Sequence, residues 1–358
     1  MTLTEINYYT KQLAPIGIIS VLVILIMVFG FRLLLLYSQI QSTPPPPSTQ
    51  PVTAYVNPVF GKINPPRISG AKPSSQYTWV LDTLDGTPNA PEASSSANVY
   101  FVPQKTASFG FLSKIYAMAK EVGIDTEITQ HQLNDKTALF NDGKHNLSMD
   151  IRDFNFSYTY TLTDEDPIAE GSDQGIEPQL TSQAISFFTK MGRYPTELSQ
   201  GKRNIIYLRF DPGSKQITPL ESSDGANMAE VDFFPADIDG KPVVTSSYYN
   251  SPNYVLFLLG GRDFRIVRSY LNYFEKTLDG FGTYPLRPPQ DAWAELQAGK
   301  GIVVSSSSNS GEVKIQKVFL AYYESEEYQE YVQPVYVYLG EGRFVAYVPA
   351  LATEYLNP

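Results

Sequence analysis

The chain contains no cysteine and only two histidines, His131 and His145, among its 358 residues. Without thiols there is no disulfide framework, thiolate zinc site, iron–sulfur cluster or cysteine nucleophile. Two histidines are too few for a His-rich metal site, and any Ser-His-Asp triad would have to use one of them. The common thiol- and imidazole-based chemistries are therefore largely excluded.

Positive charge is also scarce, since 27 basic residues face 37 acidic ones and the net charge is −10. Such a chain lacks the broad basic surface that phosphate backbones require, so we expect no nucleic-acid partner. Charged residues make up 18% and hydrophobic residues 42% of the chain, a composition that excludes overall disorder. The length allows one to three domains.

The longest apolar run extends from Ile16 to Phe31 and continues after Arg32 to Tyr37. As a helix, residues 16–37 would be about 33 Å long, against a bilayer core of about 30 Å. Arg32 lies near one end, where a long side chain can reach the interface. A cleaved signal peptide fits less well, because the run is long and no A-x-A-like cleavage site follows. We predict a transmembrane helix over residues 15–37, in contact with membrane lipid from Ile16 to Tyr37, behind a cytoplasmic tail of residues 1–14.

Four consecutive prolines, Pro44 to Pro47, follow the apolar run, and further prolines continue to Pro73. Proline runs adopt the extended polyproline II conformation, so we expect residues 38–75 to form a semi-rigid stalk. A short tail, an anchor and a long body are typical of a signal anchor with the amino terminus inside and the body outside the cell membrane. Because secreted eukaryotic domains of this size usually carry cysteines, a bacterial or archaeal envelope is expected.

The body alternates helical and strand-like sequence. Three segments with apolar residues at helical spacing end on a glycine that can cap a helix, namely Gly123, Gly192 and Gly299. Strand-like sequence follows each one, most clearly from Phe154 to Leu162, where apolar and polar residues alternate. The segment around Gly340-Glu341-Gly342 predicts a hairpin.

This order predicts an α+β fold in which helices pack on one face of antiparallel sheets. The predicted units are three helix-then-strands modules over residues 76–175, 176–285 and 286–358. The three capping glycines are unequally spaced, which favours related modules over a strict repeat.

Some polar groups resemble known sites, yet each has a simpler explanation. Asp237-Ile-Asp239-Gly240 resembles the start of a calcium loop, but Lys241-Pro242 supplies none of the ligands that should follow, so a tight turn is favoured. Glycosidase chemistry needs two carboxylates held across a cleft, whereas the two acidic groups of this chain border strand ends. These groups are Asp164-Glu165-Asp166 and Glu324, Glu326, Glu327.

The two histidines lie next to neither a helix-borne carboxylate nor a G-x-S-x-G elbow, so we interpret both as surface or turn residues. The sequence has no G-x-x-x-x-G-K-[ST] and no G-x-G-x-x-G, which leaves phosphate-loop nucleotide binding without support. Ser305 to Ser308 fit a flexible strand end. We therefore predict no catalytic, metal-binding or cofactor-binding residue, and no enzyme activity.

Tyrosine is abundant, with 25 residues against 2 tryptophans. Aromatic residues favour strands and pack well in sheet cores, which is the favoured explanation. The alternative is a tyrosine-rich face that binds protein or glycan. The tyrosines on predicted strands are Tyr158, Tyr160, Tyr322, Tyr323, Tyr336, Tyr338 and Tyr347.

The last 75 or so residues carry a resemblance, in a helix and the strands that follow it. The residues are Tyr284-Pro285-Leu286, Ala292-Trp293, Leu296, Gly299-Lys300-Gly301, Val318, Leu320, Tyr322-Tyr323, Tyr331 to Val337 and Val345 to Ala350. This segment resembles bacterial extracytoplasmic PepSY-like modules, and in particular the membrane-anchored YycH/YycI-type regulators of a cell-wall sensor kinase. The resemblance implies helix-plus-antiparallel-sheet modules of PepSY or cystatin type and a non-enzymatic regulatory role, and it carries over no site residue.

We expect a single-pass envelope protein whose external body binds a protein partner, such as a membrane sensor or a wall-assembly complex. Two alternatives stay open. One is an anchored hydrolase that acts on cell-wall polymer, which needs a pocket with convergent carboxylates or a histidine beside a hydroxyl. The other is a structural subunit of a surface layer or pilus.

Overall fold

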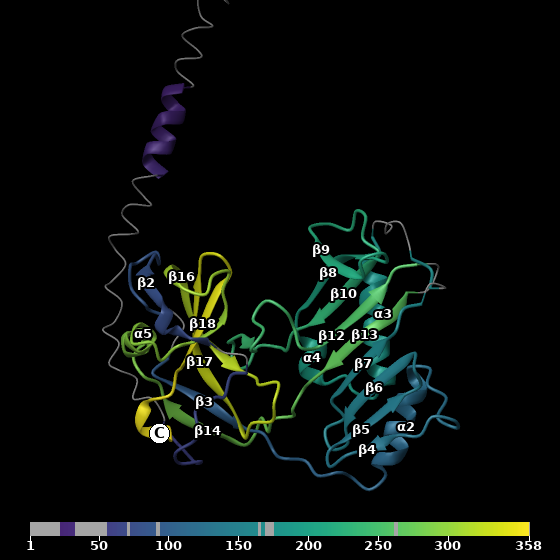
Figure 1. Ribbon diagram of the computed structural model, residues 1–358. Helices are drawn as coiled ribbons and strands as arrows, with labels where there is room; N and C mark the ends of the chain where they lie inside the picture. Colours follow the sequence, from purple (N-terminus) through teal and green to yellow (C-terminus); the bar gives the residue numbers. More distant parts are fainter. Residues whose placement is uncertain are drawn as a thin grey trace, which may run out of the picture. The chain divides into compact units, whose positions relative to one another are not determined.

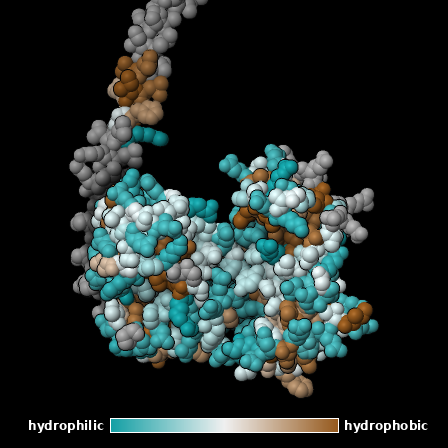
Figure 2. All heavy atoms as spheres, in the orientation of Figure 1, coloured by the Kyte–Doolittle hydropathy of each residue, from teal (hydrophilic) through white to brown (hydrophobic). Residues whose placement is uncertain are grey.

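The computed structural model describes residues 22–32, 56–69, 72–90, 94–163, 166–168, 175–260 and 264–357. The chain divides into two units, residues 1–54 and residues 55–358. In the first unit the described residues form a helix over 22–32, whose large apolar side chains are between 47% and 67% exposed. Figure 2 shows this helix as apolar surface.

Among the described residues, no helix is both long and apolar enough to cross a membrane. The predicted transmembrane helix over 15–37 is described only at residues 22–32. The predicted tail over 1–14 and residues 38–55, 70 and 71 of the predicted stalk lie outside the described residues.

The second unit is α+β with mostly antiparallel strands, as predicted, and it contains two nine-stranded sheets (Figure 1). The helix-covered sheet has the order β4-β5-β6-β7-β13-β12-β10-β8-β9 and is antiparallel throughout. Its strands are β4 (Gln132–Leu133), β5 (Thr137–Asn141), β6 (His145–Asp150), β7 (Phe156–Tyr160), β8 (Arg203–Asp211), β9 (Gln216–Leu220), β10 (Met228–Phe233), β12 (Tyr254–Leu258) and β13 (Arg265–Leu271).

This sheet consists of two similar halves. In the first half α2 (Phe111–Glu121) precedes the meander β4 to β7, and in the second α3 (Glu177–Lys190) and α4 (Thr196–Gln200) precede β8, β10, β12 and β13. The last strands of the halves, β7 and β13, pair with each other. One core lies between the sheet and the helices, where Tyr116 of α2 meets Phe140 at 5.2 Å and Phe188 of α3 meets Phe233 at 5.1 Å between ring centres.

The carboxyl-terminal sheet has the order β1-β15-β18-β17-β16-β11, with β2 paired to β16 and β3 paired to β14 and β17. Helix α5 (Pro289–Gln297) packs on it, and its core residues Ala292 and Leu296 are fully buried. The sheet's elements are β1 (Lys72–Pro73), β2 (Tyr77–Leu81), β3 (Ser96–Phe101), β11 (Val243–Val244), β14 (Phe281–Pro285), β15 (Ile302–Ser305), β16 (Gly311–Tyr323), β17 (Tyr331–Gly340) and β18 (Phe344–Pro349), with short 3-10 helices η1 (Ser74–Gln76) and η2 (Thr353–Tyr355) beside it.

The three predicted helices are confirmed as α2, α3 and α5, and their terminal glycines adopt positive φ angles of 88°, 66° and 78°. Glycine suits these positions because a left-handed backbone carries no Cβ penalty there. The predicted hairpin is also confirmed, with β17 and β18 paired from Gly340 and Phe344 onwards. Strands β2 and β3, which fall in residues 76–175, pair within the carboxyl-terminal sheet and not with β4 to β7.

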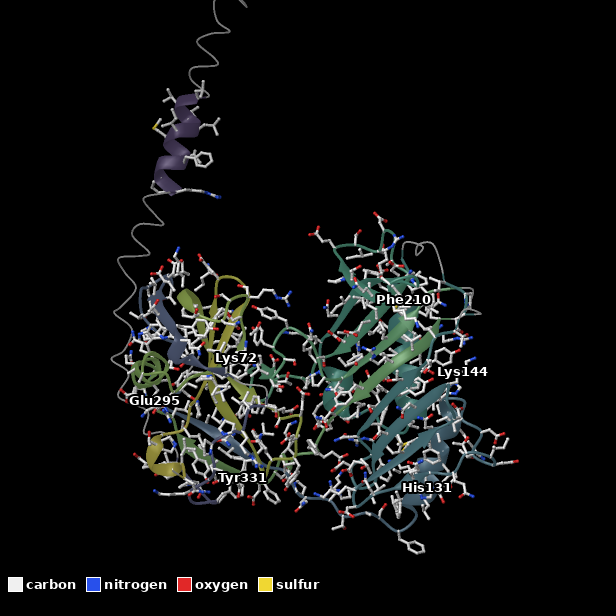
Figure 3. All side chains as sticks on the ribbon, viewed as in Figure 1. Lys72, His131, Lys144, Phe210, Glu295 and Tyr331 are labelled. Atoms are coloured by element: carbon white, nitrogen blue, oxygen red, sulfur yellow. The ribbon has the colours of Figure 1, made fainter. Side chains whose placement is uncertain are left out.

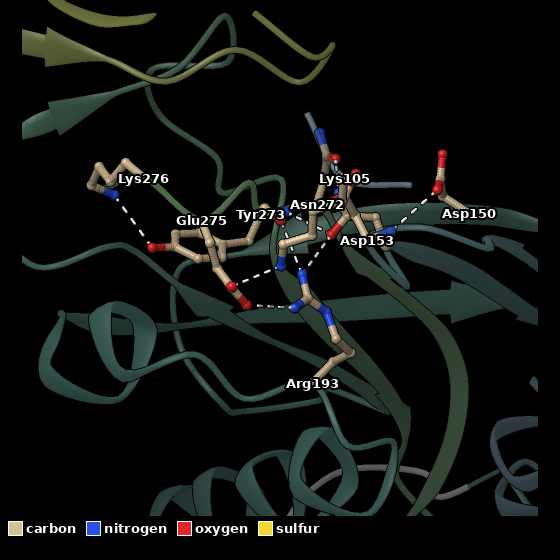
Figure 4. A network of polar contacts seen from close by, with 9 residues as sticks. Lys105, Asp150, Asp153, Arg193, Asn272, Tyr273, Glu275 and Lys276 are labelled. Carbon is tan, nitrogen blue, oxygen red and sulfur yellow. Dashed lines mark hydrogen bonds and ion pairs between the residues drawn. The ribbon is translucent and has the colours of Figure 1, made fainter. Parts of the chain in front are cut away.

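A polar network lies around the segment that follows β13 (Figure 4). After β13, Lys276 forms an ion pair of 2.6 Å with Glu324, which follows β16, and the Lys276 side chain is only 1% exposed. Nearby, the Asn272 amide donates to the backbone oxygen of Glu326. On the same side Arg193, at the end of α3, donates to Asn155 at 3.0 Å and to the Tyr273 carbonyl at 2.9 Å. These contacts fix the segment after β13 between the sheets.

Candidate functional site

A groove of about 640 Å³ opens between the start of β8, the segment 234–249 and strand β16. Its floor is apolar and half-buried, so part of each side chain meets solvent. The floor residues are Phe234, Pro242, Val243, Tyr248, Tyr249 and Phe319. Both sheets contribute, because β8 belongs to the helix-covered sheet and β11 and β16 to the carboxyl-terminal sheet.

A close backbone approach sets the β8 side of the groove. A Cβ added to Gly201 would lie 1.8 Å from the Phe234 carbonyl oxygen, so only glycine fits there. The next residue, Lys202, accepts a backbone hydrogen bond of 2.9 Å from Phe234. Gly201 thus brings Lys202, which precedes β8, and Arg203, the first residue of β8, beside the segment that begins at Phe234.

The opposite side is held by two buried tyrosines. The hydroxyl of Tyr322 donates to Asp239 at 2.7 Å, and that of Tyr347 donates to the Thr245 carbonyl at 2.9 Å. Between these contacts, β11 pairs in parallel with β16, with Val243 opposite Tyr322. Asp239 and Gly240 have φ angles of 51° and 69°, so Asp237-Ile-Asp239-Gly240 is the tight turn that the sequence favoured.

Two aromatic residues dominate the floor. The rings of Tyr248 and Tyr249 meet edge to face at 5.0 Å, and the Arg343 guanidinium lies 4.3 Å from the centre of the Tyr249 ring. Burial raises the pKa of the Tyr248 hydroxyl, which stays neutral at physiological pH. The sequence offered a single signal for this pair: adjacent aromatics inside an otherwise polar segment.

The rim of the groove is positively charged. Lys202, Arg203 and Lys317 line it and are exposed, and Arg343 is exposed above Tyr249. Within the described parts of the chain, none of these four cations has a carboxylate within 4 Å. Asp237 is the one acidic residue among the described residues of the lining. The sign of the rim is therefore opposite to that of the chain, which carries −10.

Two of the rim cations are held in place by neighbours. Arg203 donates to the Tyr194 hydroxyl and to the Ser199 carbonyl, both at 2.8 Å. The Lys317 ammonium lies 5.3 Å from the centre of the Phe319 ring. Cations fixed over aromatic rings lose little freedom when a ligand binds.

The strand tyrosines lie elsewhere. All seven of those singled out in the sequence are buried, so their rings serve packing, as favoured. Tyr248 and Tyr249, which the sequence did not single out, lie in a turn and are half-buried.

The two histidines lie apart from the groove. His131 lies beside α2 and β4 (Figure 3), with its Nδ1 3.0 Å from the Tyr116 hydroxyl. His145 has a carboxylate partner that the sequence reading missed, because Asp142 of its own turn lies 2.9 Å from its Nδ1. His145 lines a second cavity, of about 560 Å³, together with Ser186 of α3.

The acidic groups do not converge. Asp166 is buried and paired with Arg265 at 2.5 Å, and hydrogen bonds and this cation outweigh its burial, so its pKa lies below the ordinary value. Asp164 and Glu165, the other two residues of this acidic group, lie outside the described residues. Glu324 pairs with Lys276, and Glu326 accepts a hydrogen bond from Ser246. In the described part of the chain, no three histidine, aspartate or glutamate side chains are placed to hold a metal ion.

Known proteins offer little guidance. No protein-family model and no curated protein matches the chain. Among solved structures, an uncharacterized protein from Eubacterium rectale is 13% identical, with 75% of this chain and 85% of that one covered at a TM-score of 0.33. The YpeB C-terminal domain of Bacillus megaterium is 10% identical, with 70% and 95% covered at a TM-score of 0.29. At TM-scores this low, neither likeness assigns a fold type or a function.

Proposed function

We propose that this chain is a single-pass membrane-anchored envelope protein whose body binds and regulates a protein partner without catalysis. The groove between the two sheets carries the proposal. It combines a half-buried aromatic floor with arginine and lysine side chains, and aromatic residues and arginine are enriched where proteins contact each other. Its two walls come from different sheets, so an occupant would contact both.

The membrane placement rests on the sequence. The apolar run from Ile16 to Tyr37 is long enough for a bilayer and would contact lipid, and the proline-rich residues 38–75 would act as a spacer. In this arrangement the amino terminus lies inside and the body outside, and the partner is a membrane sensor or a wall-assembly complex. The net charge of −10 gives no support for nucleic acid as a partner.

A finer fold type is part of the proposal. In the helix-covered sheet a helix twice precedes an antiparallel meander, and in the carboxyl-terminal sheet α5 precedes β15 to β18. This order supports PepSY-like modules, and with the anchor it supports a regulator of YycH/YycI type.

Photocrosslinking in cells tests the binding role. A photoreactive phenylalanine analogue is placed at position 249 of the full chain, and the same analogue at the 82% exposed Ile128 serves as the control. We expect a discrete crosslinked protein at position 249 that is absent at position 128. Equal products at both positions, or none at position 249, would contradict the proposal.

Trimming of the body by protease added to intact cells tests the outside location, and full protection of the body would overturn it.

One observation favours a second function, an anchored hydrolase that acts on wall polymer. His145 is paired with Asp142 and shares a cavity with the Ser186 hydroxyl, which are the residue types of a nucleophile and its base. Release of soluble fragments from isolated cell walls by the full chain would support it, provided that His145→Ala abolishes the release. Equal release by the two proteins, or no release, would exclude this role for His145.

A further inference from the structure

We propose that the occupant of the groove is an extended acidic segment of the protein partner, with apolar or aromatic side chains between its carboxylates. This inference rests on the proposed protein-binding function and adds the chemistry of the partner. The positive rim predicts its acidic residues, the apolar floor predicts its apolar side chains, and the free edge of β11 predicts its extended conformation.

The charge of the rim selects an acidic occupant. Lys202, Arg203, Lys317 and Arg343 surround the floor, and only Asp237 opposes them among the described residues of the lining. Since none of the four has a carboxylate within 4 Å in the described ranges, their charges are available to a ligand. The rest of an acidic protein repels such a ligand, so the positive rim directs it to the groove.

The floor demands apolar side chains as well. Phe234, Val243, Tyr248, Tyr249 and Phe319 are all half-buried, and each leaves apolar surface in contact with water. A volume of about 640 Å³ holds a few side chains and not a folded domain. A purely ionic ligand would leave this surface uncovered, whereas apolar side chains gain from covering it.

The edge of β11 favours an extended chain. The backbone N–H groups of Tyr322 and Glu324 donate to the carbonyls of Pro242 and Val244, both at 2.9 Å. The hydrogen bonds to β16 are thus made by the residues on either side of Val243. In a parallel pair the backbone groups of the intervening residue point away from the partner strand. In the described chain β11 has no other neighbouring strand, so the N–H and C=O of Val243 can bond an added segment.

The test measures the binding of labelled twelve-residue peptides to the full chain in lipid nanodiscs. One peptide alternates glutamate with phenylalanine and valine. A second replaces glutamate with lysine, and a third replaces the apolar residues with serine. Inorganic polyphosphate is the competitor. We expect only the first peptide to bind well, with binding that weakens as salt is added.

Charge reversal locates the binding. The double variant Lys202→Glu/Lys317→Glu should bind the first peptide with an affinity lower by about tenfold or more, because two attractions become repulsions. The matched control is Lys120→Glu with Lys136→Glu, which reverses two exposed lysines away from the groove and should leave the affinity unchanged. Tyr249→Ala should also lower the affinity for the first peptide, although it leaves the rim charges in place. It therefore tests the groove independently if the double variant fails to fold.

The outcomes separate this inference from the proposed function. If the lysine or serine peptide binds as tightly as the first peptide, the occupant is not an acidic segment with apolar side chains. The same conclusion follows if the Lys202→Glu/Lys317→Glu variant binds the first peptide as tightly as the native chain. Full displacement by polyphosphate with no preference for apolar residues makes the groove a site for anionic polymer. If crosslinks at position 249 persist while no acidic peptide binds, the occupant is wrong and the binding role stands. If the crosslinks are also absent, both fail.

Discussion

The two nine-stranded sheets of the body are built around different aromatic residues. In the helix-covered sheet, α2 and α3 close one large core in which phenylalanines meet, such as Phe188 with Phe156 and Phe233. In the carboxyl-terminal sheet, tyrosines fill smaller cores on both faces of the strands. Phenylalanine supplies apolar area alone, whereas a buried tyrosine also needs a hydrogen-bond acceptor.

Those acceptors explain what the tyrosines contribute. Tyr322 and Tyr347 bond Asp239 and Thr245, which lie on the segment that forms one wall of the groove. Tyr336 bonds the Arg287 carbonyl at the entrance to α5. Buried tyrosines of the carboxyl-terminal sheet therefore position connecting segments. In the helix-covered sheet, whose large core is richer in phenylalanine, Tyr160 does the same through Asp166. The buried strand tyrosines therefore hold one wall of the groove in place, whereas Tyr248 and Tyr249 lie on its floor.

The largest effect is expected where the two sheets meet. Lys276→Met leaves the Glu324 carboxylate, which is only 15% exposed, without its cation, and we expect the free energy of unfolding to fall by about 3 kcal/mol. Loss of this contact should also separate the unfolding of the two sheets. Chemical denaturation followed by tyrosine fluorescence and by far-ultraviolet circular dichroism would then show two transitions that do not coincide.

The control for this joint is Lys105→Met. Lys105 pairs with Glu275 at 2.7 Å, but both side chains are partly exposed, so a loss below about 1 kcal/mol is expected. Equal losses in the two variants would show that the joint is no more than a surface ion pair, and that the sheets are coupled by other contacts.

A pH effect should distinguish the helix-covered sheet. Asp232 on β10 is fully buried, and among the described residues neither carboxylate oxygen has a hydrogen-bond partner. Burial, assisted by the nearby charge of Glu230, raises its pKa to about 7. The folded state thus holds a proton that the unfolded state releases near pH 4, so this group's stabilisation is lost as pH rises from about 4 to about 7.

Asp232→Asn removes that charge at nearly constant shape. We expect a gain of about 2 kcal/mol at pH 8 and no gain at pH 3.5, measured by urea denaturation at both values. Asp135→Asn, at an exposed loop position, should show neither change. A variant that is equally stable relative to the native chain at both pH values would show that Asp232 is solvated in the folded protein.

The sequence predicted much of each element and little of their assembly. Helical spacing with terminal glycines located α2, α3 and α5, and alternation located β7, because these signals are local. The parallel pairing of β2 with β16 depends on contacts more than 230 residues apart, for which local patterns carry no information. The groove has the same origin, since Lys202, Tyr249 and Lys317 come from three distant segments. Only the tyrosine pair left a trace, as aromatics in a polar stretch.

A smaller effect should separate the tyrosines of the carboxyl-terminal sheet from one another. Tyr347→Phe removes the donor to the Thr245 carbonyl and leaves a buried acceptor unpaired, at a cost of about 1 kcal/mol. Tyr338→Phe is the matched control, because the buried Tyr338 hydroxyl has no partner among the described residues and its loss should be neutral or slightly stabilising. Equal costs would mean that the hydroxyls do not position loops, and the contrast between the sheets would reduce to ring packing.

The smallest effect on stability is expected at the groove itself. Lys317 is exposed in the middle of β16 and has no carboxylate within 4 Å among the described residues, so Lys317→Glu should change the free energy of unfolding by less than about 0.5 kcal/mol. Substitution of a residue that stabilises the fold lowers the free energy of unfolding, whereas substitution of a surface residue that contacts only a partner does not. A neutral stability combined with weaker binding of the acidic peptide would therefore show that the rim serves recognition. A clear loss of stability would instead assign Lys317 to the joint between the sheets, because its charge would then be needed by neighbours within the body.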